Sequence, residues 1–215
     1  MTDWITRWQE GKIGWHKNQP NSRLIEFIDC LKLSTNACVF VPLCGKSVDM
    51  LYVLEKGFKV LGVELSELAT RQFFVENELH FSTKKSGKFV IFSSENIDIY
   101  CGDYFDLDAS VLNHVSAVYD RASLIALPLA LRAKYASHLY AIIPAGCRML
   151  LLTLNYPQSQ VSGPPYAVNK TEVVSLFKGF ECQQLQCFDD IKNEPKFQRE
   201  NVDFIEKATY CLRKK

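Results

Sequence analysis

The sequence lacks a net charge of either sign. Lys and Arg together number 25 in the 215 residues, against 24 for Asp and Glu. Without a net field, little draws the chain to nucleic acid or to an anionic membrane surface. We therefore expect the partner to be a small molecule, and neither nucleic acid nor a membrane.

The sequence also shows no pattern typical of a signal peptide, a membrane-spanning run or a metal-binding motif, and we expect none of the three. Its first residues, MTDWITRWQEGKIGWH, carry charges where a signal peptide needs an uninterrupted apolar segment. No later apolar run approaches the roughly 20 residues that cross a bilayer. The eight cysteines include no C-x-x-C pair and no Cys/His cluster with zinc spacing. These absences predict a cytoplasmic protein with reduced thiols and no metal site.

What the chain does contain is enough apolar sequence for one sizeable core, with 47% hydrophobic residues. We expect a single domain over residues 1–215, with an N-terminal arm over residues 1–20. Short β-type runs alternate with longer helical patterns, which favours an α/β fold with a mostly parallel sheet covered by helices. No exposed apolar helix face is evident, so we expect a monomer.

The pattern along the chain places the elements as follows. Strands are predicted at 37–43, 58–64, 97–101, 115–120, 147–156, 180–188 and 202–212, and 89–93 is predicted to be the hairpin partner of 97–101. Helices are predicted at 21–33, 47–57, 66–79, 128–143 and 170–179. Asn21, Ser47 and Ser66 are the expected N-caps, and Gly57 is expected to end its helix in a left-handed conformation. The two late runs complete a sheet of roughly seven strands.

The turn PLCGKS, residues 42–47, joins the first strand to its helix and holds one glycine, Gly45. A dinucleotide-binding turn needs G-x-G-x-x-G, and a P-loop needs a further glycine where this chain has Phe40. Both phosphate-binding interpretations are therefore weak. Glu64 ends the second strand, where an acid commonly accepts hydrogen bonds from ribose hydroxyls. Spacing alone leaves open a nucleoside ligand without phosphates, or an acid that only caps a helix or faces solvent.

An ordered set of segments resembles the thiopurine S-methyltransferases, a branch of the class I methyltransferases that use S-adenosylmethionine. The segments are RWQEGKIGWH, VPLCGKSVDM, GVELSELA, GDYFDL, YDRASLIALP, LRAKYASHL and GPPYAV, spread over nearly the whole chain. The resemblance implies a Rossmann-like sandwich with helices on both faces of a mostly parallel, seven-stranded sheet. It also implies that the PLCGKS turn replaces a glycine-rich motif and cradles the methionine end of the cofactor.

The resemblance assigns cofactor contacts to particular residues. Trp8 in the arm and Leu43 in the turn would contact S-adenosylmethionine, and Glu64 would hold its ribose hydroxyls. Asp103 and Tyr104, in the segment GDYF, would lie near the adenine.

The acceptor side is implied in the same way. Arg121, in YDRA, would lie on the cofactor and substrate side. Trp15 stands where the family commonly has Phe in IGFH, and Tyr166 stands where GPPF is common, so both keep an aromatic wall around the substrate. His16 is the fourth acceptor-side residue, either as a proton acceptor or as a hydrogen-bonding anchor for the arm.

Methyl transfer from a sulfonium depends mainly on alignment and on exclusion of water. Arg121 is the candidate catalytic residue because a guanidinium stays charged and favours a thiolate acceptor; the alternative is an ion pair that only shapes the loop. Cys44 is expected to pack under the turn and not to act as a nucleophile. The arm, with Gly11 and Gly14, is expected to be a hinged lid, unless its tryptophans are ordinary core aromatics.

Three hypotheses about function follow. The first is an S-adenosylmethionine-dependent methyltransferase acting on the sulfur of thiopurine-like or other aromatic or heterocyclic thiols, or on selenium or tellurium oxyanions. The second is a non-catalytic module that binds a nucleoside or S-adenosylmethionine. The third, a P-loop hydrolase, would bind ATP with magnesium and lacks its first glycine. Intact Glu64, Arg121 and PLCGKS favour the enzyme.

Overall fold

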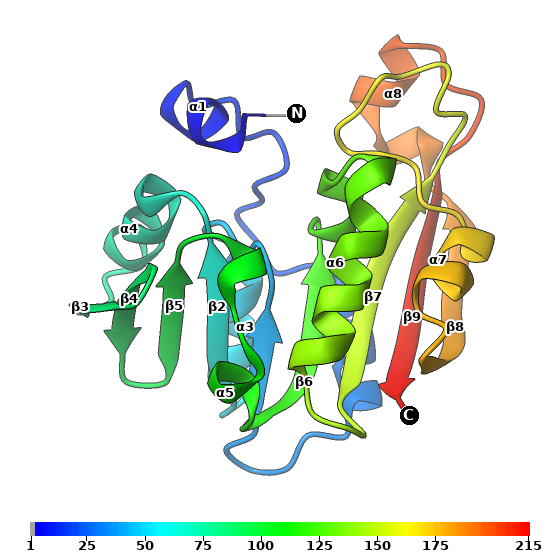
Figure 1. The fold of residues 1–215 in the computed structure, drawn as a ribbon. Helices are drawn as coiled ribbons and strands as arrows, with labels where there is room; N and C mark the ends of the chain where they lie inside the picture. Colours follow the sequence, from blue (N-terminus) through cyan, green and yellow to red (C-terminus); the bar gives the residue numbers. More distant parts are fainter. Residues whose placement is uncertain (1–2) are drawn as a thin grey trace.

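The sheet organises the fold. The computed structural model describes residues 3–215, and the strands in that range form one nine-stranded sheet (Figure 1). Its strands in spatial order are β3 (Ser82–Ser86), β4 (Phe89–Ser94), β5 (Ile97–Cys101), β2 (Lys59–Glu64), β1 (Cys38–Val41), β6 (Val115–Arg121), β7 (Arg148–Asn155), β9 (Glu206–Lys214) and β8 (Phe180–Asp189). The five strands from β5 to β7 are parallel, whereas β3 with β4, β4 with β5, β7 with β9 and β9 with β8 are antiparallel.

The predicted count of seven strands is wrong. The strands from β5 to β8 make a continuous seven-stranded section, and the hairpin of β3 and β4 extends it at one edge. The sequence of β3, STKKS, has all of its residues exposed and no apolar alternation. Its pairing is therefore invisible to a hydrophobic pattern, and its lysines suit an exposed sheet edge.

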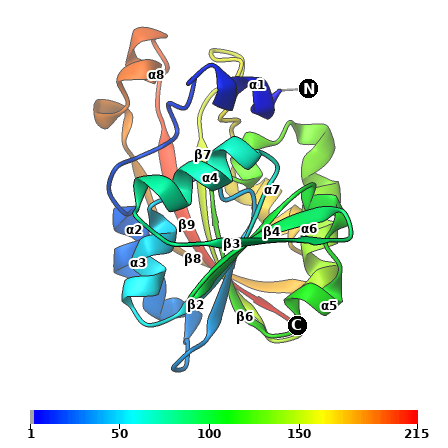
Figure 2. The ribbon, with the colours of Figure 1, turned by 90° about the vertical axis from the view of Figure 1, so that its left-hand side faces the viewer.

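Helices cover both faces of the sheet, as predicted. The α-helices are α1 (Trp4–Gln9), α2 (Ser22–Phe27), α3 (Asp49–Glu55), α4 (Glu67–Glu76), α5 (Ala109–Leu112), α6 (Leu129–Ile142), α7 (Lys170–Leu176) and α8 (Pro195–Arg199). The 3₁₀ turns are η1 (Ile28–Leu31), η2 (Tyr104–Asp106), η3 (Leu124–Ala126) and η4 (Ile191–Asn193). Helices α2 and α3 lie on one face, and α5 and α6 lie on the other (Figure 2). No helix in residues 3–215 has the length and apolarity needed to cross a membrane.

The helix caps follow the local sequence closely. The side chains of Asn21 and Ser66 cap α2 and α4, and Gly57 ends α3 with φ +79°, all as predicted. The predicted cap Ser47 lies two residues before the start of α3, although its hydroxyl still accepts from the Asp49 amide at 3.3 Å. The predicted helix 21–33 is interrupted, because α2 is followed by the 3₁₀ turn η1.

Two apolar cores lie on opposite faces of the central strands. Along β1, Val39 and Val41 pack in the core beneath α2 and α3, whereas Phe40 packs in the core beneath α6. Because these strands are buried on both faces, the groups free to meet a ligand are at their ends. Strand β1 lies between β2 and β6, so the order in which the strands are added reverses at β1. In open α/β sheets, ligands bind at the carboxyl edge beside such a strand. In Figure 1 this edge is uppermost, and α1 lies above it.

Candidate active site

The turn after β1 has an unusual backbone. Leu43 has φ +46° and Gly45 has φ +54°, and in the loop after β6 Ala122 has φ +65°. Residues other than glycine rarely adopt these angles, and they persist where the surroundings hold them. One such restraint joins the two loops, since the Ser123 hydroxyl donates to the Pro42 carbonyl at 2.6 Å. Strained backbone therefore gathers at the carboxyl ends of β1 and β6.

Glu64 ends β2 and supports this turn. One carboxylate oxygen accepts from the Gly45 amide and the other from the Ser66 amide, each at 2.8 Å, and the residue is only 6% exposed. Burial raises the pKa of Glu64, and the amide hydrogen bonds oppose that shift. A carboxylate has about four acceptor positions, so each oxygen retains one for a further donor such as a ribose hydroxyl. The acceptor expected at this strand end therefore fits the ribose hydroxyls of the cofactor.

The N-terminal arm lies directly on the turn. A Cβ placed on Gly45 would be 2.9 Å from Cζ2 of Trp8, so the indole packs against a residue that must have no side chain. Trp8 makes an edge-on contact with Trp15 at 5.6 Å between ring centroids, and Trp15 makes another with Trp4 at 5.1 Å. The three tryptophans form one aromatic cluster above the carboxyl edge.

Arg121 lies beneath that cluster. Its Nη2 donates to the Trp15 carbonyl at 3.3 Å, its Nη1 is 3.7 Å from Oδ2 of Asp49, and its side chain is 16% exposed. Asp120, the neighbouring acid considered in the sequence as an ion-pair partner, instead accepts from the Tyr135 hydroxyl at 2.7 Å. The Arg121 guanidinium thus joins the arm to the sheet and keeps part of its surface open to a ligand.

Asp49 is a site residue that the sequence analysis missed. It is 1% exposed and accepts from the Asn21 amide at 2.7 Å and from the Tyr119 hydroxyl at 2.9 Å, besides facing Arg121. Its carboxylate therefore holds the start of α2, directly after the arm, together with a strand and the guanidinium. The available signal was an acid beside Met50 and Val53 on the buried side of a largely apolar helix, where a charge needs partners.

Two residues of the turn carry reactive groups, but both have structural roles: Lys46 forms an ion pair and Cys44 packs against the sheet. Lys46 is 8% exposed, and its Nζ lies 2.6 Å and 2.8 Å from the two carboxylate oxygens of Glu76 in α4. A lysine neutralised in this way is not placed to bind phosphate. Cys44 packs against Gly62, and burial raises the pKa of its thiol. The packing role predicted for Cys44 is confirmed.

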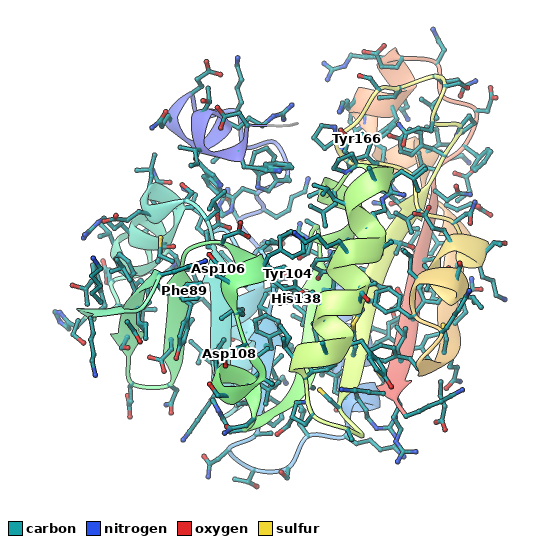
Figure 3. All side chains as sticks on the ribbon, viewed as in Figure 1. Phe89, Tyr104, Asp106, Asp108, His138 and Tyr166 are labelled. Carbon is teal, nitrogen blue, oxygen red and sulfur yellow. The ribbon has the colours of Figure 1, made fainter. Side chains whose placement is uncertain are left out.

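His16 and Tyr166 lie at the same edge. Burial, followed by the charges of Lys46 and Arg121, lowers the pKa of His16, although Glu76 opposes them. This keeps the imidazole neutral. Tyr166 belongs to the loop above α6 (Figure 3), and its amide donates to the carbonyl of Ile125 in η3 at 2.7 Å. The loop is thereby fastened beside the end of β6.

Asp103 and Tyr104 follow β5 and lie apart from the arm cluster. Asp103 is exposed and accepts from the Phe105 amide at 2.9 Å, which caps η2. The Tyr104 ring is buried against Tyr135 and His138, with centroids 4.9 Å and 5.0 Å away (Figure 3). The Gly102 amide donates to the Glu64 carbonyl at 2.9 Å, so this segment starts beside Glu64. Contact of Asp103 and Tyr104 with adenine stays a prediction.

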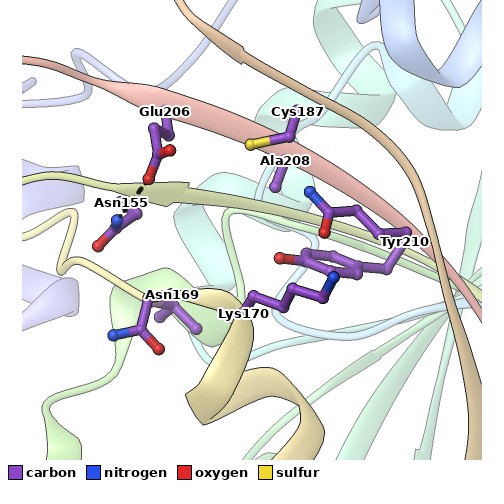
Figure 4. A pocket seen from close by; sticks show the side chains of 9 residues that line it. Asn155, Asn169, Lys170, Cys187, Glu206, Ala208 and Tyr210 are labelled. Carbon is purple, nitrogen blue, oxygen red and sulfur yellow. Dashed lines mark hydrogen bonds between the residues drawn. The ribbon is translucent and has the colours of Figure 1, made fainter.

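A separate hollow of about 150 Å³ lies between α7 and the strands β8 and β9 (Figure 4). Its lining residues are Asn155, Val168, Asn169, Lys170, Gln184, Cys187, Glu206, Ala208 and Tyr210. The residues predicted for the cofactor and the acceptor are not among them. Within the described part of the chain, no three His, Cys, Asp or Glu side chains gather as a metal site.

Comparison with solved structures defines the class of the fold. A methyltransferase from Anabaena variabilis, described as S-adenosylmethionine-dependent, superposes with a TM-score of 0.67 at 14% identity and covers 99% of this chain and 93% of its own. A Haemonchus contortus phosphoethanolamine N-methyltransferase in complex with S-adenosylhomocysteine gives 0.64 at 14% identity, over 90% of this chain and 52% of its own. The protein has the Rossmann-like fold of class I methyltransferases.

The chain belongs to the thiopurine S-methyltransferase family. The family model described as "Thiopurine S-methyltransferase (TPMT)" matches residues 1–215. A thiopurine S-methyltransferase from Shewanella sp. (strain MR-4) is 42% identical, and the match covers 99% of this chain and 98% of that protein. A probable thiopurine S-methyltransferase from Yarrowia lipolytica is 44% identical, with 95% and 96% covered. The protein is therefore an S-adenosylmethionine-dependent methyltransferase.

Proposed function

We propose that the enzyme methylates the sulfur of aromatic and heterocyclic thiols of the thiopurine kind. The names of its relatives point to this class of acceptor. The observation that carries the proposal is the position of Arg121, a partly open guanidinium between buried Asp49 and the tryptophan cluster of the arm. A flat thiolate needs both an aromatic wall and a positive charge, and this edge of the sheet offers both.

The cofactor would be held at the neighbouring strand ends. Glu64 would accept hydrogen bonds from the ribose hydroxyls, while Leu43 and Trp8 would enclose the methionine end from the turn and from the arm. Asp103 and Tyr104 would border the adenine. When bound, S-adenosylmethionine supplies a methyl group on a positively charged sulfur, which an acceptor sulfur receives in an in-line displacement.

The acceptor would lie between Arg121, Trp15, His16 and Tyr166. The guanidinium favours the ionised thiol, because an opposite charge nearby lowers the pKa of an acid. The lowered pKa of His16, which follows from its burial, leaves its imidazole able to accept a proton from a less acidic thiol. Selenium and tellurium oxyanions form a second acceptor class, supported by the same guanidinium, since Arg is well suited to oxyanions.

The arm, residues 1–20, would act as a lid that excludes water from the transfer. This role is supported by the fit of Trp8 on Gly45 and by the hydrogen bond between Arg121 and the Trp15 carbonyl. We further propose that residues 1–215 act as a single domain, as a monomer and in the cytoplasm. Light scattering of the purified protein on a sizing column tests the monomer directly.

A transfer assay tests the proposal. The purified protein receives S-adenosylmethionine with either 4-nitrothiophenol or its oxygen counterpart 4-nitrophenol, and methylated product is measured by mass spectrometry. Methylation of the thiol in clear preference to the phenol supports the proposal, and selenite in a third arm tests the oxyanion class. Binding of S-adenosylhomocysteine without product from any acceptor would favour the non-catalytic binding module instead.

A further inference from the structure

Two cysteines lie together on the face of the sheet covered by α2 and α3. Cys211 belongs to β9 and pairs in register with Leu150 of β7, and its Sγ donates to the Cys30 carbonyl of η1 at 3.5 Å. The two side chains also interact, since each shifts the pKa of the other. They are 181 positions apart in the chain, so a local sequence pattern does not reveal the pair.

Arg148, the first residue of β7, completes the cluster. Its Nη1 donates to the Cys30 carbonyl at 3.5 Å, which places the guanidinium beside both cysteines. The Cys30 thiol and Arg148 lower the pKa of Cys211, while burial works in the opposite direction. The Cys211 side chain, followed by burial, raises the pKa of Cys30. Cys211 is therefore the more acidic thiol of the pair and the better placed to act as a nucleophile.

Small molecules can reach Cys211 although the residue is buried. A hollow of about 150 Å³ opens beside it, lined by Arg148, Glu181, Cys182, Gln183, Cys211, Leu212 and Arg213. The other cysteines are less reactive, since burial raises the pKa of Cys38, Cys44, Cys101, Cys147, Cys182 and Cys187. The neighbouring guanidinium thus distinguishes Cys211 from Cys182 and Cys187, although those two thiols are more exposed.

We propose that Cys211 and Cys30 form a peroxide-reactive dithiol that closes to a disulfide. The Cys211 thiolate attacks one oxygen of hydrogen peroxide, the O–O bond breaks, and Cys211 becomes a sulfenic acid while hydroxide leaves. The Cys30 sulfur then displaces the sulfenic hydroxyl, which leaves as water after taking the Cys30 proton, while the hydroxide from the first step takes a proton from solvent. The two sulfurs lose two electrons in total, and the peroxide gains them.

The bridge would join η1 to β9 at the end of the sheet opposite the candidate active site. Cys211 pairs with Leu150 near the start of β7, whereas the active-site edge is at the carboxyl ends of the parallel strands. We therefore expect methyl transfer to continue in the oxidised protein. The melting temperature rises, because the cross-link restricts a long segment of the unfolded chain.

Peptide mapping tests the dithiol. The full-length protein is exposed to hydrogen peroxide, remaining thiols are blocked, and a non-reducing digest is read by mass spectrometry. We expect a linked peptide that contains Cys30 and Cys211, two thiols fewer per chain, and loss of the link on reduction. In Cys30→Ser, which cannot close the bridge, a sulfenic acid trapped by dimedone at Cys211 is expected.

Matched variants separate the dithiol from general oxidation. Arg148→Gln should slow formation of the bridge by about twofold at neutral pH, since the thiolate of Cys211, whose pKa is about 6, loses a neighbouring positive charge; Arg148→Lys, which keeps the charge, should restore most of the rate. Cys182→Ser, at the same hollow, should bridge at the wild-type rate. Oxidation that spreads over Cys182 and Cys187 without the bridge, or an unchanged rate in Arg148→Gln, overturns the proposal.

Discussion

Two regions of the molecule differ in how far their charged side chains are buried: the carboxyl edge of β1, β2 and β6, and the C-terminal strand pair β9–β8. At the first, Asp49 and Glu64 are buried, and each is held by two or more hydrogen-bond or ion-pair partners. At the second, Arg213 and Glu181 are 3.7 Å apart with side chains 51% and 63% exposed. Exposed pairs contribute little stability, whereas buried charges require a complete set of partners. Costly charges are therefore concentrated where ligands bind.

The backbone shows the same contrast. Leu43 and Ala122 hold left-handed angles at the central edge, while β9 pairs with β7 in an unbroken antiparallel register and with β8 in a register that shifts only between Gln184 and Gln186. Regular pairing stabilises a fold, and strained residues usually persist for another reason. Substitutions at the carboxyl edge of β1, β2 and β6 should therefore reduce activity most, and substitutions in β8 and β9 should reduce it least.

Removal of residues 1–16 is expected to have the largest effect. The truncation takes Trp8 away from Gly45 and the Trp15 carbonyl away from Arg121. We expect methyl transfer to fall below detection while circular dichroism shows a folded protein, since both main cores lie outside the arm. Full activity in the shortened chain would show that the arm is not a lid needed for methyl transfer.

Asp120 gives a pH-dependent prediction about stability. Burial raises its pKa from 3.8 to about 6, despite hydrogen bonds from Tyr135 and Leu124. Between these values the unfolded chain releases the proton while the folded protein keeps it, so the free energy of unfolding falls as the pH rises. The loss should total about 3 kcal/mol by neutral pH. Urea unfolding at pH 4, 5, 6 and 7 should show a steeper fall in the wild type than in Asp120→Asn, in which only other buried acids such as Glu64 contribute; parallel profiles would contradict it.

Arg121→Ala should lower turnover more than cofactor binding. A hydrogen bond to a charged group is worth roughly 1.5–3 kcal/mol, so turnover should drop by about tenfold to a hundredfold. Steady-state kinetics measure turnover, and calorimetry measures the affinity for S-adenosylhomocysteine. The control is Arg213→Ala in β9, which removes an exposed arginine and should leave both quantities unchanged. Wild-type turnover in Arg121→Ala would exclude Arg121 from the mechanism.

Glu64→Ala should weaken binding of S-adenosylhomocysteine by more than about tenfold, equivalent to 1.4 kcal/mol. The variant loses the expected ribose acceptors and also the support of the Gly45 and Ser66 amides. Glu67→Ala, three residues later in α4 and exposed, is the matched control. Equal affinities in the two variants, measured by calorimetric titration, would show that Glu64 does not hold the ribose.

Local features of the sequence predicted much of the fold. The period of α6, the caps at Asn21 and Ser66 and the left-handed Gly57 depend on residues close in the chain, and the structure confirms all of them. Strand β3 was not predicted because its sequence has no hydrophobic alternation. It is a strand only because its backbone pairs with β4.

The candidate site was predictable only in part. Family motifs named Trp8, Trp15, Glu64 and Arg121, and the structure brings all four to one edge. Asp49 was missed because its importance comes from partners at Asn21, Tyr119 and Arg121, which folding alone makes its neighbours. Residues so far apart in the chain produce no hydrophobic periodicity or local motif from which their contact could be predicted.

Hydrogen–deuterium exchange with and without S-adenosylhomocysteine tests the central claim, that the ligand site is the carboxyl edge of β1, β2 and β6. We predict protection in the arm, in residues 42–47 and in residues 64–66, with little change in β8 and β9. Protection confined to β8, β9 and the hollow beside α7 would contradict this claim and would place the cofactor at the lateral edge of the sheet formed by β8.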